Sequence, residues 1–348
     1  MAGDANILVY GPAYLDLVIT IDQPLCAPHR VDKSIRVSAV IANNDNTIHL
    51  HGENGDDMLF PLADAFQQYA ADYYLSESVL PGIEKIDKSY HVISCQRQLG
   101  GMGAGYALAL NGLLRHPQGE DSRGDFVSMQ LRQCGVVAQA EILTGESDLS
   151  LVIIGGEDKL TMGQRPMMTK WRATEEDHRF VADASALCFC GAPNALTASL
   201  LPYAQSMPIM LAPSRRNIND IDFPLAVLAG RVSYLTLNRL EWEELPEKEL
   251  WRKNTPIITI TDGPNGCQVI LATGEEFSLP AHPHHGMADT NRCGETFGTA
   301  FFRTLVRECP QIYRCGVSES IARVAAEYAL LQAWRQMGIF AFGMPEMQ

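Results

Sequence analysis

Short apolar runs near the N-terminus have the length and composition of buried strands. Residues 7–11 read Ile-Leu-Val-Tyr-Gly, and a second apolar stretch, Leu17–Ile21, follows Asp16. Both predict strands of the kind that opens an α/β unit. From Val31 to Leu50 apolar and polar residues partly alternate, which predicts strands of a sheet with one solvated face.

Two more segments complete this N-terminal region. Residues 51–57 are polar and include Gly52 and Gly55, which predicts a turn or loop. Residues 60–75 place Leu62 and Phe66 along one side of a helix and so predict a helix.

Beyond Gly105 strand-like apolar runs alternate with helical stretches. Such alternation predicts a largely parallel sheet that helices cover on both faces. The predicted helices span about 104–114, 122–134, 174–184, 195–204, 239–251, 294–308 and 317–337. The predicted strands are Leu149–Ile154, Ala186–Cys190, Ile209–Leu211, Tyr234–Leu237 and Ile257–Thr261.

Composition narrows the function classes. The chain has 348 residues, 46% hydrophobic and 20% charged, which fits a globular protein with one large α/β domain and an appendage, or with two modest domains. The net charge of −14 opposes binding to a polyanion, so we expect no nucleic acid partner. A helix N-terminus with a few arginines can still hold a small anion.

The nine cysteines are scattered and include no Cys-x-x-Cys pair, which argues against a disulfide framework and against a zinc site. The N-terminus has no basic region typical of a signal peptide. The uncharged stretch from about 98 to 114 is rich in glycine and too short for a membrane span. We therefore expect a cytoplasmic protein without a membrane partner.

Common nucleotide and hydrolase signatures are missing. The chain has no Gly-Lys dipeptide, and hence no Walker A loop, and no Gly-x-Gly-x-x-Gly after Gly11. Gly-x-Ser-x-Gly and His-Glu-x-x-His are absent as well.

The segment from Gly294 to Arg307 has the pattern of a helix with an acidic first turn. Backbone N–H groups at a helix start have no partners within the helix and favour an anion. Glu295 in that turn could take a proton from an attacking hydroxyl. Alternatively, Thr290 caps the helix and Glu295 only complements its dipole.

Five segments, in this order along the chain, favour the first interpretation by resemblance to a family. They are Gly100-Gly101-Met102-Gly103-Ala104-Gly105-Tyr106-Ala107, residues 124–136 ending in Gly-Val, Asn238-Arg239-Leu240-Glu241, Thr261-Asp262-Gly263-Pro264-Asn265-Gly266, and Asp289-Thr290-Asn291-Arg292-Cys293-Gly294-Glu295-Thr296-Phe297. Together they resemble the signatures of PfkB/ribokinase-like carbohydrate kinases. The resemblance implies a ribokinase-like three-layer αβα fold with a mostly parallel sheet, plus an enlarged small β-lid.

The resemblance also implies roles on the nucleotide side. Glu295 stands at the general base position, and Arg292, Cys293 and Gly294 stand at the anion-hole positions. Such a loop suits in-line phosphoryl transfer from ATP, which needs positioning and charge stabilisation.

Two more motifs belong to this side. Asn238 and Glu241 match the pair that holds Mg²⁺ through water, although they also read as a helix cap with its third residue. Thr261, Gly263 and Gly266 match the turn beside the nucleotide, or form an ordinary hairpin turn.

On the acceptor side, the resemblance implies that Asp16 binds sugar hydroxyls and that Gly100 and Gly101 let the backbone approach the acceptor. It implies one kinase domain over 1–348. The lid with an insertion spans about 17–98, and the main core comprises 99–348 together with the strand at 6–16. The partners would be ATP and a small sugar-like or nucleoside-like acceptor. A homodimer through the lid is one role for its enlargement of roughly 50 residues.

Departures from the family pattern gather at functional positions. Glu295 replaces Asp, Gly105 replaces an acceptor-binding Asn, and Met102 replaces a Lys. Arg292 replaces a Gly whose backbone angles can disfavour a side chain; its guanidinium could stabilise phosphate charge or fill the phosphate site. Two hypotheses follow: an active kinase, or a degenerate member that binds a ligand or partner without turnover.

Overall fold

The computed structural model describes residues 6–21, 35–42, 47–52, 57–61, 76–77, 92–155, 158–204, 206–283, 292–312 and 316–341. Asp289, Thr290 and Asn291, and most of the helix predicted at 60–75, lie outside these residues. Within the described part of the chain, no helix is both long and apolar enough to cross a membrane.

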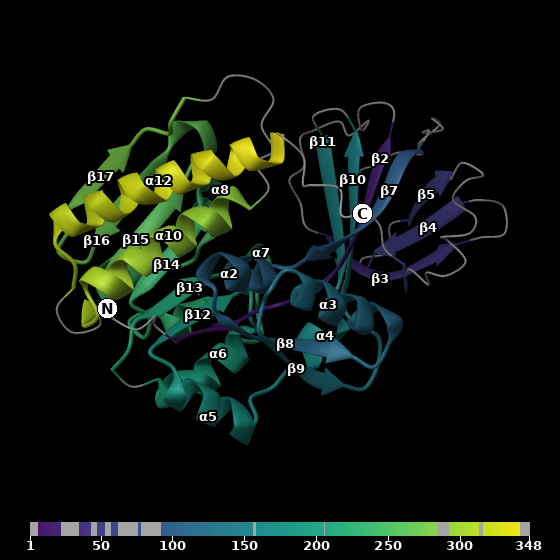
Figure 1. The fold of residues 1–348 in the computed structure, drawn as a ribbon, viewed down its shortest axis with the longest axis horizontal. Helices are drawn as coiled ribbons and strands as arrows, with labels where there is room; N and C mark the ends of the chain where they lie inside the picture. Colours follow the sequence, from purple (N-terminus) through teal and green to yellow (C-terminus); the bar gives the residue numbers. More distant parts are fainter. Residues whose placement is uncertain are drawn as a thin grey trace.

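A nine-stranded sheet forms the centre of the molecule, in the order β17-β16-β15-β14-β13-β12-β1-β8-β9 (Figure 1). The pairs from β15 through β9 are all parallel, and β16 and β17 add an antiparallel edge. The strands are β1 (Ile7–Tyr10), β8 (Leu113–Gly119), β9 (Ala138–Leu143), β12 (Ala186–Cys190), β13 (Ile209–Ala212), β14 (Tyr234–Asn238), β15 (Ile257–Thr261), β16 (Cys267–Leu271) and β17 (Glu276–Leu279).

Helices cover both faces of this sheet, which makes three layers. On one face, Val9 and Cys188 pack with α2 (Met102–Leu110), α3 (Ser122–Gln133), α10 (Cys293–Glu308) and α12 (Glu319–Ala341). On the other face, Leu8 and Leu187 pack with α4 (Pro166–Lys170), α5 (Glu175–Asp183), α6 (Asn194–Leu200), α7 (Arg215–Ile218), α8 (Arg239–Glu244) and α9 (Lys248–Asn254). Because both faces are buried, these strands read as continuous apolar runs.

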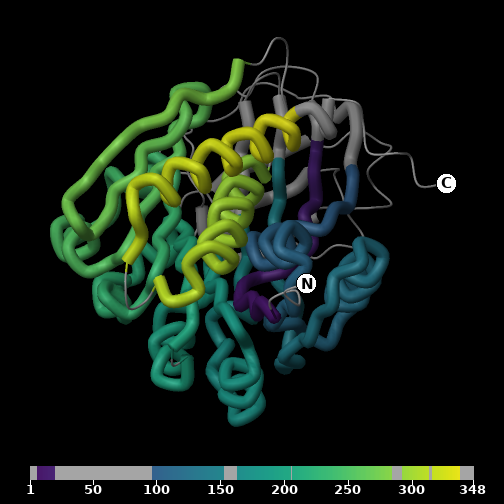
Figure 2. The backbone as a smooth tube through the Cα atoms, turned by 60° about the vertical axis from the view of Figure 1, so that its left-hand side comes forward, coloured from purple at the N-terminus to yellow at the C-terminus, as the bar shows by residue number. Residues whose placement is uncertain are grey.

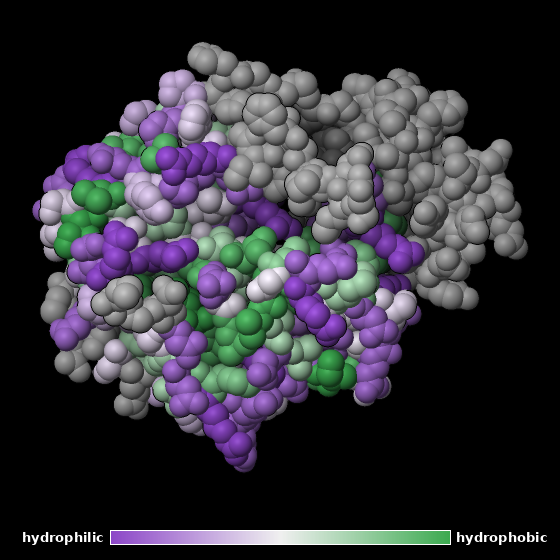
Figure 3. Space-filling model, viewed as in Figure 1, coloured by the Kyte–Doolittle hydropathy of each residue, from purple (hydrophilic) through white to green (hydrophobic). Residues whose placement is uncertain are grey.

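Figures 1 and 2 show α10 and α12 side by side over one end of the sheet. Hydrophilic side chains cover much of α12 in Figure 3, where apolar ones gather lower on the same face. Exposed large apolar residues include Leu108 and Met129. On α12 itself, Val324, Tyr328 and Trp334 are exposed as well.

A second sheet lies beside the first, in the order β5-β4-β3-β11-β10-β2-β7, with β6 paired to β3 (Figure 1). Its strands are β2 (Tyr14–Ile21), β3 (Ile35–Ala42), β4 (Thr47–Gly52), β5 (Asp57–Pro61), β6 (Ser76–Glu77), β7 (Val92–Gly100), β10 (Leu149–Gly155) and β11 (Asp158–Gln164). β10 and β11 lie within 99–348, which the sequence assigns to the main core, yet they pair with this sheet.

Most predicted elements are present, with three corrections. The helix predicted at 104–114 ends at Leu110, where Asn111 adopts a left-handed φ of 52°, and β8 follows. The helix predicted at 239–251 is two helices, because Pro246 and Glu247, with a φ of 53°, interrupt it. The turn predicted at 51–57 is partly strand, since β4 includes His51 and Gly52.

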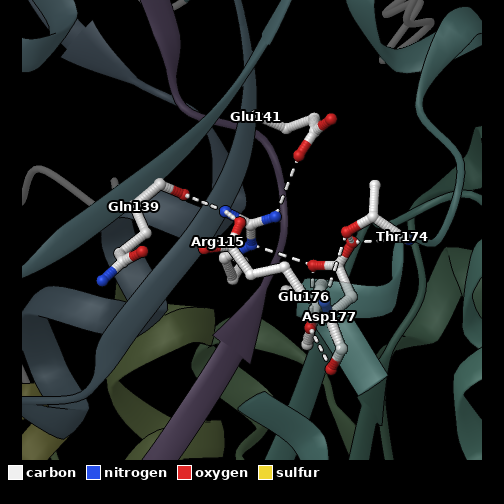
Figure 4. Close-up of polar contacts among 7 residues, drawn as sticks. Arg115, Gln139, Glu141, Thr174, Glu176 and Asp177 are labelled. Carbon is white, nitrogen blue, oxygen red and sulfur yellow. Dashed lines mark hydrogen bonds and ion pairs between the residues drawn. The ribbon is translucent and has the colours of Figure 1, made fainter. Parts of the chain in front are cut away.

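A buried polar network joins β1, β8 and β9 of the central sheet to α5 (Figure 4). Arg115 of β8 donates from Nε to Asp177 Oδ1 and from a terminal nitrogen to Glu141, each at 2.9 Å. Tyr10 donates to the same Asp177 oxygen at 3.1 Å. Arg115 and Asp177 are 1% and 0% exposed, so neither charge has water as an alternative partner.

Candidate active site

The start of α10 presents backbone N–H groups and a carboxylate together. Arg292 precedes the helix in the left-handed region, at φ 62° and ψ 4°, a conformation that favours glycine. Its side chain donates to the Leu99 carbonyl at 2.8 Å. Cys293 begins the helix with its sulfur 3.7 Å from the Ala333 carbonyl of α12. Gly294 is exposed, and a Cβ there would meet no atom within 4 Å.

A cavity of about 230 Å³ lies in front of this helix start. Its lining unites residues that are far apart in the sequence: Gly294 and Glu295 from α10, Asn238 and Glu241 from the end of β14 and α8, and Thr261 from the end of β15. The remaining lining residues are Met102, Tyr106, Ala212, Pro213, Thr236 and Leu237. The cavity therefore sits at the carboxyl ends of parallel strands, where ligands bind in open α/β sheets.

Asn238 and Glu241 form a reciprocal cap at the start of α8. Asn238 Oδ1 accepts from the Glu241 N–H at 2.8 Å, and Glu241 Oε2 accepts from the Asn238 N–H at 2.9 Å. The structure therefore confirms that Asn238 and Glu241 form a helix cap. The second Glu241 oxygen has no role in the cap.

The environment of the Glu241 carboxyl disfavours its charged form. Burial raises its pKa to about 7, and the Glu295 carboxylate adds to the rise, while the Asn238 N–H and Arg215 oppose it. Two carboxylates that face one cavity and repel each other form a donor set that suits a hard cation with water ligands. Magnesium thus fits the residues present.

The Thr261–Gly266 segment is a hairpin turn. β15 and β16 pair antiparallel on either side of it, and the Asp262 N–H donates to the Gly266 carbonyl at 2.8 Å. Gly266 has a φ of 92°, and a Cβ there would lie 2.0 Å from the Leu279 carbonyl oxygen. Gly263 has a φ of 50°. Thr261 lines the cavity, whereas both glycines shape the turn beyond it.

The residues predicted on the acceptor side also lie together. A Cβ on Gly100 would lie 2.3 to 2.4 Å from the three carboxyl atoms of Asp16, so the carboxylate rests directly on the glycine. Gly101, at φ 98°, precedes α2, where a Cβ would lie 2.3 Å from the Pro12 carbonyl oxygen. The β1–β2 connection thus packs on the start of α2.

Two contacts connect the residues predicted on the acceptor side with the residues that line the cavity. The atoms nearest to Gly105, if it carried a Cβ, would all belong to Glu295. Arg292 reaches from α10 to Leu99, next to Gly100. The guanidinium is therefore held at β7, beside the residues predicted on the acceptor side.

Some residues of this region gave no signal in the sequence. Tyr106 lines the cavity although it stands at a variable position of the resembling motif. Arg165 lies 3.8 Å over the Tyr14 ring, and burial raises the pKa of the nearby Asp148 to about 6, against the pull of Arg165 and Arg216. Arg165 lies between β11 and α4, Tyr14 begins β2 and Asp148 precedes β10, and only the fold brings them together.

No protein-family model and no curated protein sequence matches the chain. Solved structures do resemble it. Ribokinase from Giardia lamblia superposes with a TM-score of 0.67 at 14% identity, over 95% of this chain and 92% of that one. Adenosine kinase from Sinorhizobium meliloti gives 0.63 at 16% identity, over 97% and 94%. Ribokinase from Arabidopsis thaliana, complexed with ribose and ATP, gives 0.62 at 14% identity, over 94% and 92%.

The chain has the ribokinase-like fold. The predicted fold class is confirmed, including the mostly parallel three-layer core and the adjoining β-sheet. Within this ribokinase-like fold, the predicted nucleotide-side residues Asn238, Glu241 and Thr261 share a cavity with Gly294 and Glu295. The chemical roles of these residues stay predictions.

Proposed function

We propose that the protein is an ATP-dependent phosphotransferase that moves the γ-phosphoryl group to a hydroxyl of a small sugar-like or nucleoside-like acceptor. One observation carries the proposal: the start of α10, with Glu295 in its first turn, faces Glu241 and Asn238 across one cavity. An anion-binding helix end, a carboxylate beside it and a second carboxylate opposite are what phosphoryl transfer requires.

In this proposal Glu295 acts as the general base. Its carboxylate accepts the proton of the acceptor hydroxyl as that oxygen attacks phosphorus. The backbone N–H groups of the first turn, at Cys293 and Gly294, stabilise negative charge on the transferred group. The open space at Gly294 lets a phosphoryl oxygen approach the backbone closely.

Glu241, with Asn238 beside it, would hold Mg²⁺ through water. The bound cation would neutralise charge on the phosphates of ATP. Glu241 keeps one oxygen in the α8 cap while the other remains available toward the cavity. Thr261 would lie beside the nucleotide, with Gly263 and Gly266 fixing the turn behind it.

Asp16 would bind the acceptor, because its carboxylate lies on Gly100 next to the start of α2. Carboxylate oxygens accept hydrogen bonds from paired hydroxyls, which favours a polyol such as a sugar or a ribose. The Arabidopsis ribokinase structure contains ribose and ATP, and a similar nucleoside kinase from Burkholderia thailandensis contains inosine. The second sheet would close over such an acceptor and exclude water.

A second candidate is a binding protein without turnover. Arg292 favours it, because a non-glycine residue in the left-handed region narrows the loop that would receive the phosphoryl group. Its guanidinium is directed to Leu99, however, and leaves the Gly294 side of the helix start open.

Acceptor-stimulated ADP release decides between the two candidates. The purified protein is assayed with MgATP and a panel of sugars, nucleosides and related alcohols. A kinase gives stimulation by at least one acceptor, and Glu295→Gln lowers it by orders of magnitude with nucleotide binding retained. No stimulation by any acceptor, together with ligand binding that Glu295→Gln leaves unchanged, supports the binding protein.

A further inference from the structure

Helices α2 and α10 contact each other through glycines in both directions. Across from Gly105 of α2 lies Glu295: an added Cβ would be 3.4 Å from its Cγ, 3.7 Å from its Oε1 and 3.9 Å from its Cβ. Across from Gly298 of α10 lies Tyr106, whose hydroxyl would be 3.0 Å from an added Cβ. Each helix therefore receives a side chain of the other at a glycine.

The two contacts are adjacent on both helices. Gly105 and Tyr106 are neighbours in the chain, and Glu295 and Gly298 are one turn apart on the same side of α10. Tyr106 is 3% exposed and lines the same cavity as Glu295. Its pKa lies well above the usual range, because it is buried and because the Glu295 charge is close.

The Glu295 side chain therefore has little freedom on the α2 side. Its methylene lies over Gly105, and Tyr106 fills the space one turn further along. A Cβ at 105 would meet Glu295 before any other residue, since all three nearest atoms belong to it, and a larger side chain would begin from this contact.

We propose that Gly105 is a positioning residue for Glu295, and that the size of the residue at 105 and the length of the acidic side chain at 295 are matched to each other. Gly105 provides the surface on which the longer carboxylate side chain folds, and this surface sets where the carboxylate stands in the cavity. The departures at 105 and 295 are then one coupled change. This inference rests on the proposed function for its catalytic part only.

A double-mutant cycle tests the match. Gly105→Asn, Glu295→Asp and the double variant are compared with the parent for acceptor-stimulated ADP release, using whichever acceptor the panel identifies. Displacement of the carboxylate by roughly an ångström lowers turnover by about 100-fold in Gly105→Asn. Turnover in the double variant is expected to be at least about tenfold higher than in Gly105→Asn, because the shorter Asp side chain makes room for Asn. Losses that simply multiply would overturn the proposal.

Thermal unfolding of the same four proteins, without ligands, tests the match independently of catalysis. Gly105→Asn is expected to lower Tm, and Glu295→Asp to recover much of that loss. The control is Gly112→Ala, whose added Cβ would meet the Ile7 carbonyl oxygen and Val9 and no part of Glu295; its loss of Tm should be the same in the parent and in the Glu295→Asp background. An equal loss from Gly105→Asn in both backgrounds overturns the inference.

The two arms separate the failure of the inference from that of the proposed function. Coupled Tm values without turnover in any protein refute the kinase and leave the positioning contact standing. Turnover in the parent with uncoupled values in both assays refutes the match and leaves the kinase standing.

Discussion

Asn238 and Glu241 each accept a hydrogen bond from the backbone N–H of the other, at 2.8 and 2.9 Å. The cap fixes the Glu241 carboxylate at the end of β14, facing the Glu295 carboxylate across the cavity. A local helix-capping motif thereby places a carboxyl whose pKa is raised to about 7. Under the proposed function, this carboxyl is the one that would hold Mg²⁺ through water.

Glu241→Gln should remove a pH-dependent cost to stability. The folded pKa of about 7 lies above the ordinary 4.5, so the native state binds the extra proton between these values and stability falls as pH rises through them. The variant keeps an oxygen for the cap without the charge. Without metal, its Tm relative to the parent should rise from pH 4.5 to 7 and then level off.

Magnesium gives the complementary measurement. At pH 8, MgCl₂ should raise the Tm of the parent more than that of Glu241→Gln, because a cation relieves the repulsion only where both carboxylates are present. Equal metal-dependent shifts, or equal pH slopes in metal-free buffer, would refute the role assigned to Glu241.

Arg292 should tolerate glycine better than alanine. Glycine removes the left-handed strain, worth about 1–2 kcal/mol, and so offsets the lost hydrogen bond to Leu99, worth about 1 kcal/mol. Alanine keeps the strain and loses the bond. Urea unfolding should place Arg292→Ala about 1 kcal/mol or more below Arg292→Gly; the reverse order would contradict this account of the loop.

Gly100→Ala should impair the acceptor site more than the nucleotide site. The added Cβ would lie 2.3 Å from Asp16 Cγ, so the carboxylate must turn away from its present position. If Asp16 binds the acceptor, KM for the acceptor rises by an order of magnitude or more while nucleotide affinity changes little. Asp16→Asn is the matched control and should show the same pattern. If Asp16→Asn has the same KM for the acceptor as the parent, Asp16 does not belong to the acceptor site.

His116→Leu should flatten the acid side of the stability profile. His116 is 1% exposed, and burial lowers its pKa to about 4, helped by the neighbouring charge of Arg115. Its neutral form is the native one, so the stability it contributes is complete above pH 6.5 and is lost as pH falls to 4, by about 3 kcal/mol. Urea unfolding at pH 7.5 and pH 5 should show about 2 kcal/mol of this loss, because pH 5 still lies above the folded pKa of about 4. The same fall in parent and variant would exclude His116 as its source.

Asp177→Ala should cost about 3–5 kcal/mol, because it leaves the Arg115 charge buried without its main partner (Figure 4). The double variant with Arg115→Met should lose clearly less than the sum of the two single variants, since the buried guanidinium is then absent and its other close partner, Glu141, is 22% exposed and can be hydrated. Additive losses in urea unfolding would show that the two charges stabilise the fold separately.

Much of the fold follows from local sequence. Buried strands such as Ala186–Cys190 and Ile257–Thr261 have the predicted bounds, because continuous apolar runs of that length suit strands buried on both faces. The C-terminal end predicted for the helix at 104–114 was wrong. Leu113 and Leu114 suit a helix or a strand equally, and they form a strand because they pair with β1. The missed break at Leu245 had a local signal in Pro246.

By itself the sequence determined the alternating elements, the order of the motifs and the cap formed by Asn238 and Glu241, because each depends on residues a few positions apart. The tertiary structure alone decided that Arg292 reaches Leu99 and that Glu295 folds over Gly105. The partners in each pair are far apart in the chain, and their contact depends on how α2 and α10 pack on one face of the sheet. No local pattern encodes that packing, because it results from the burial of many apolar side chains together.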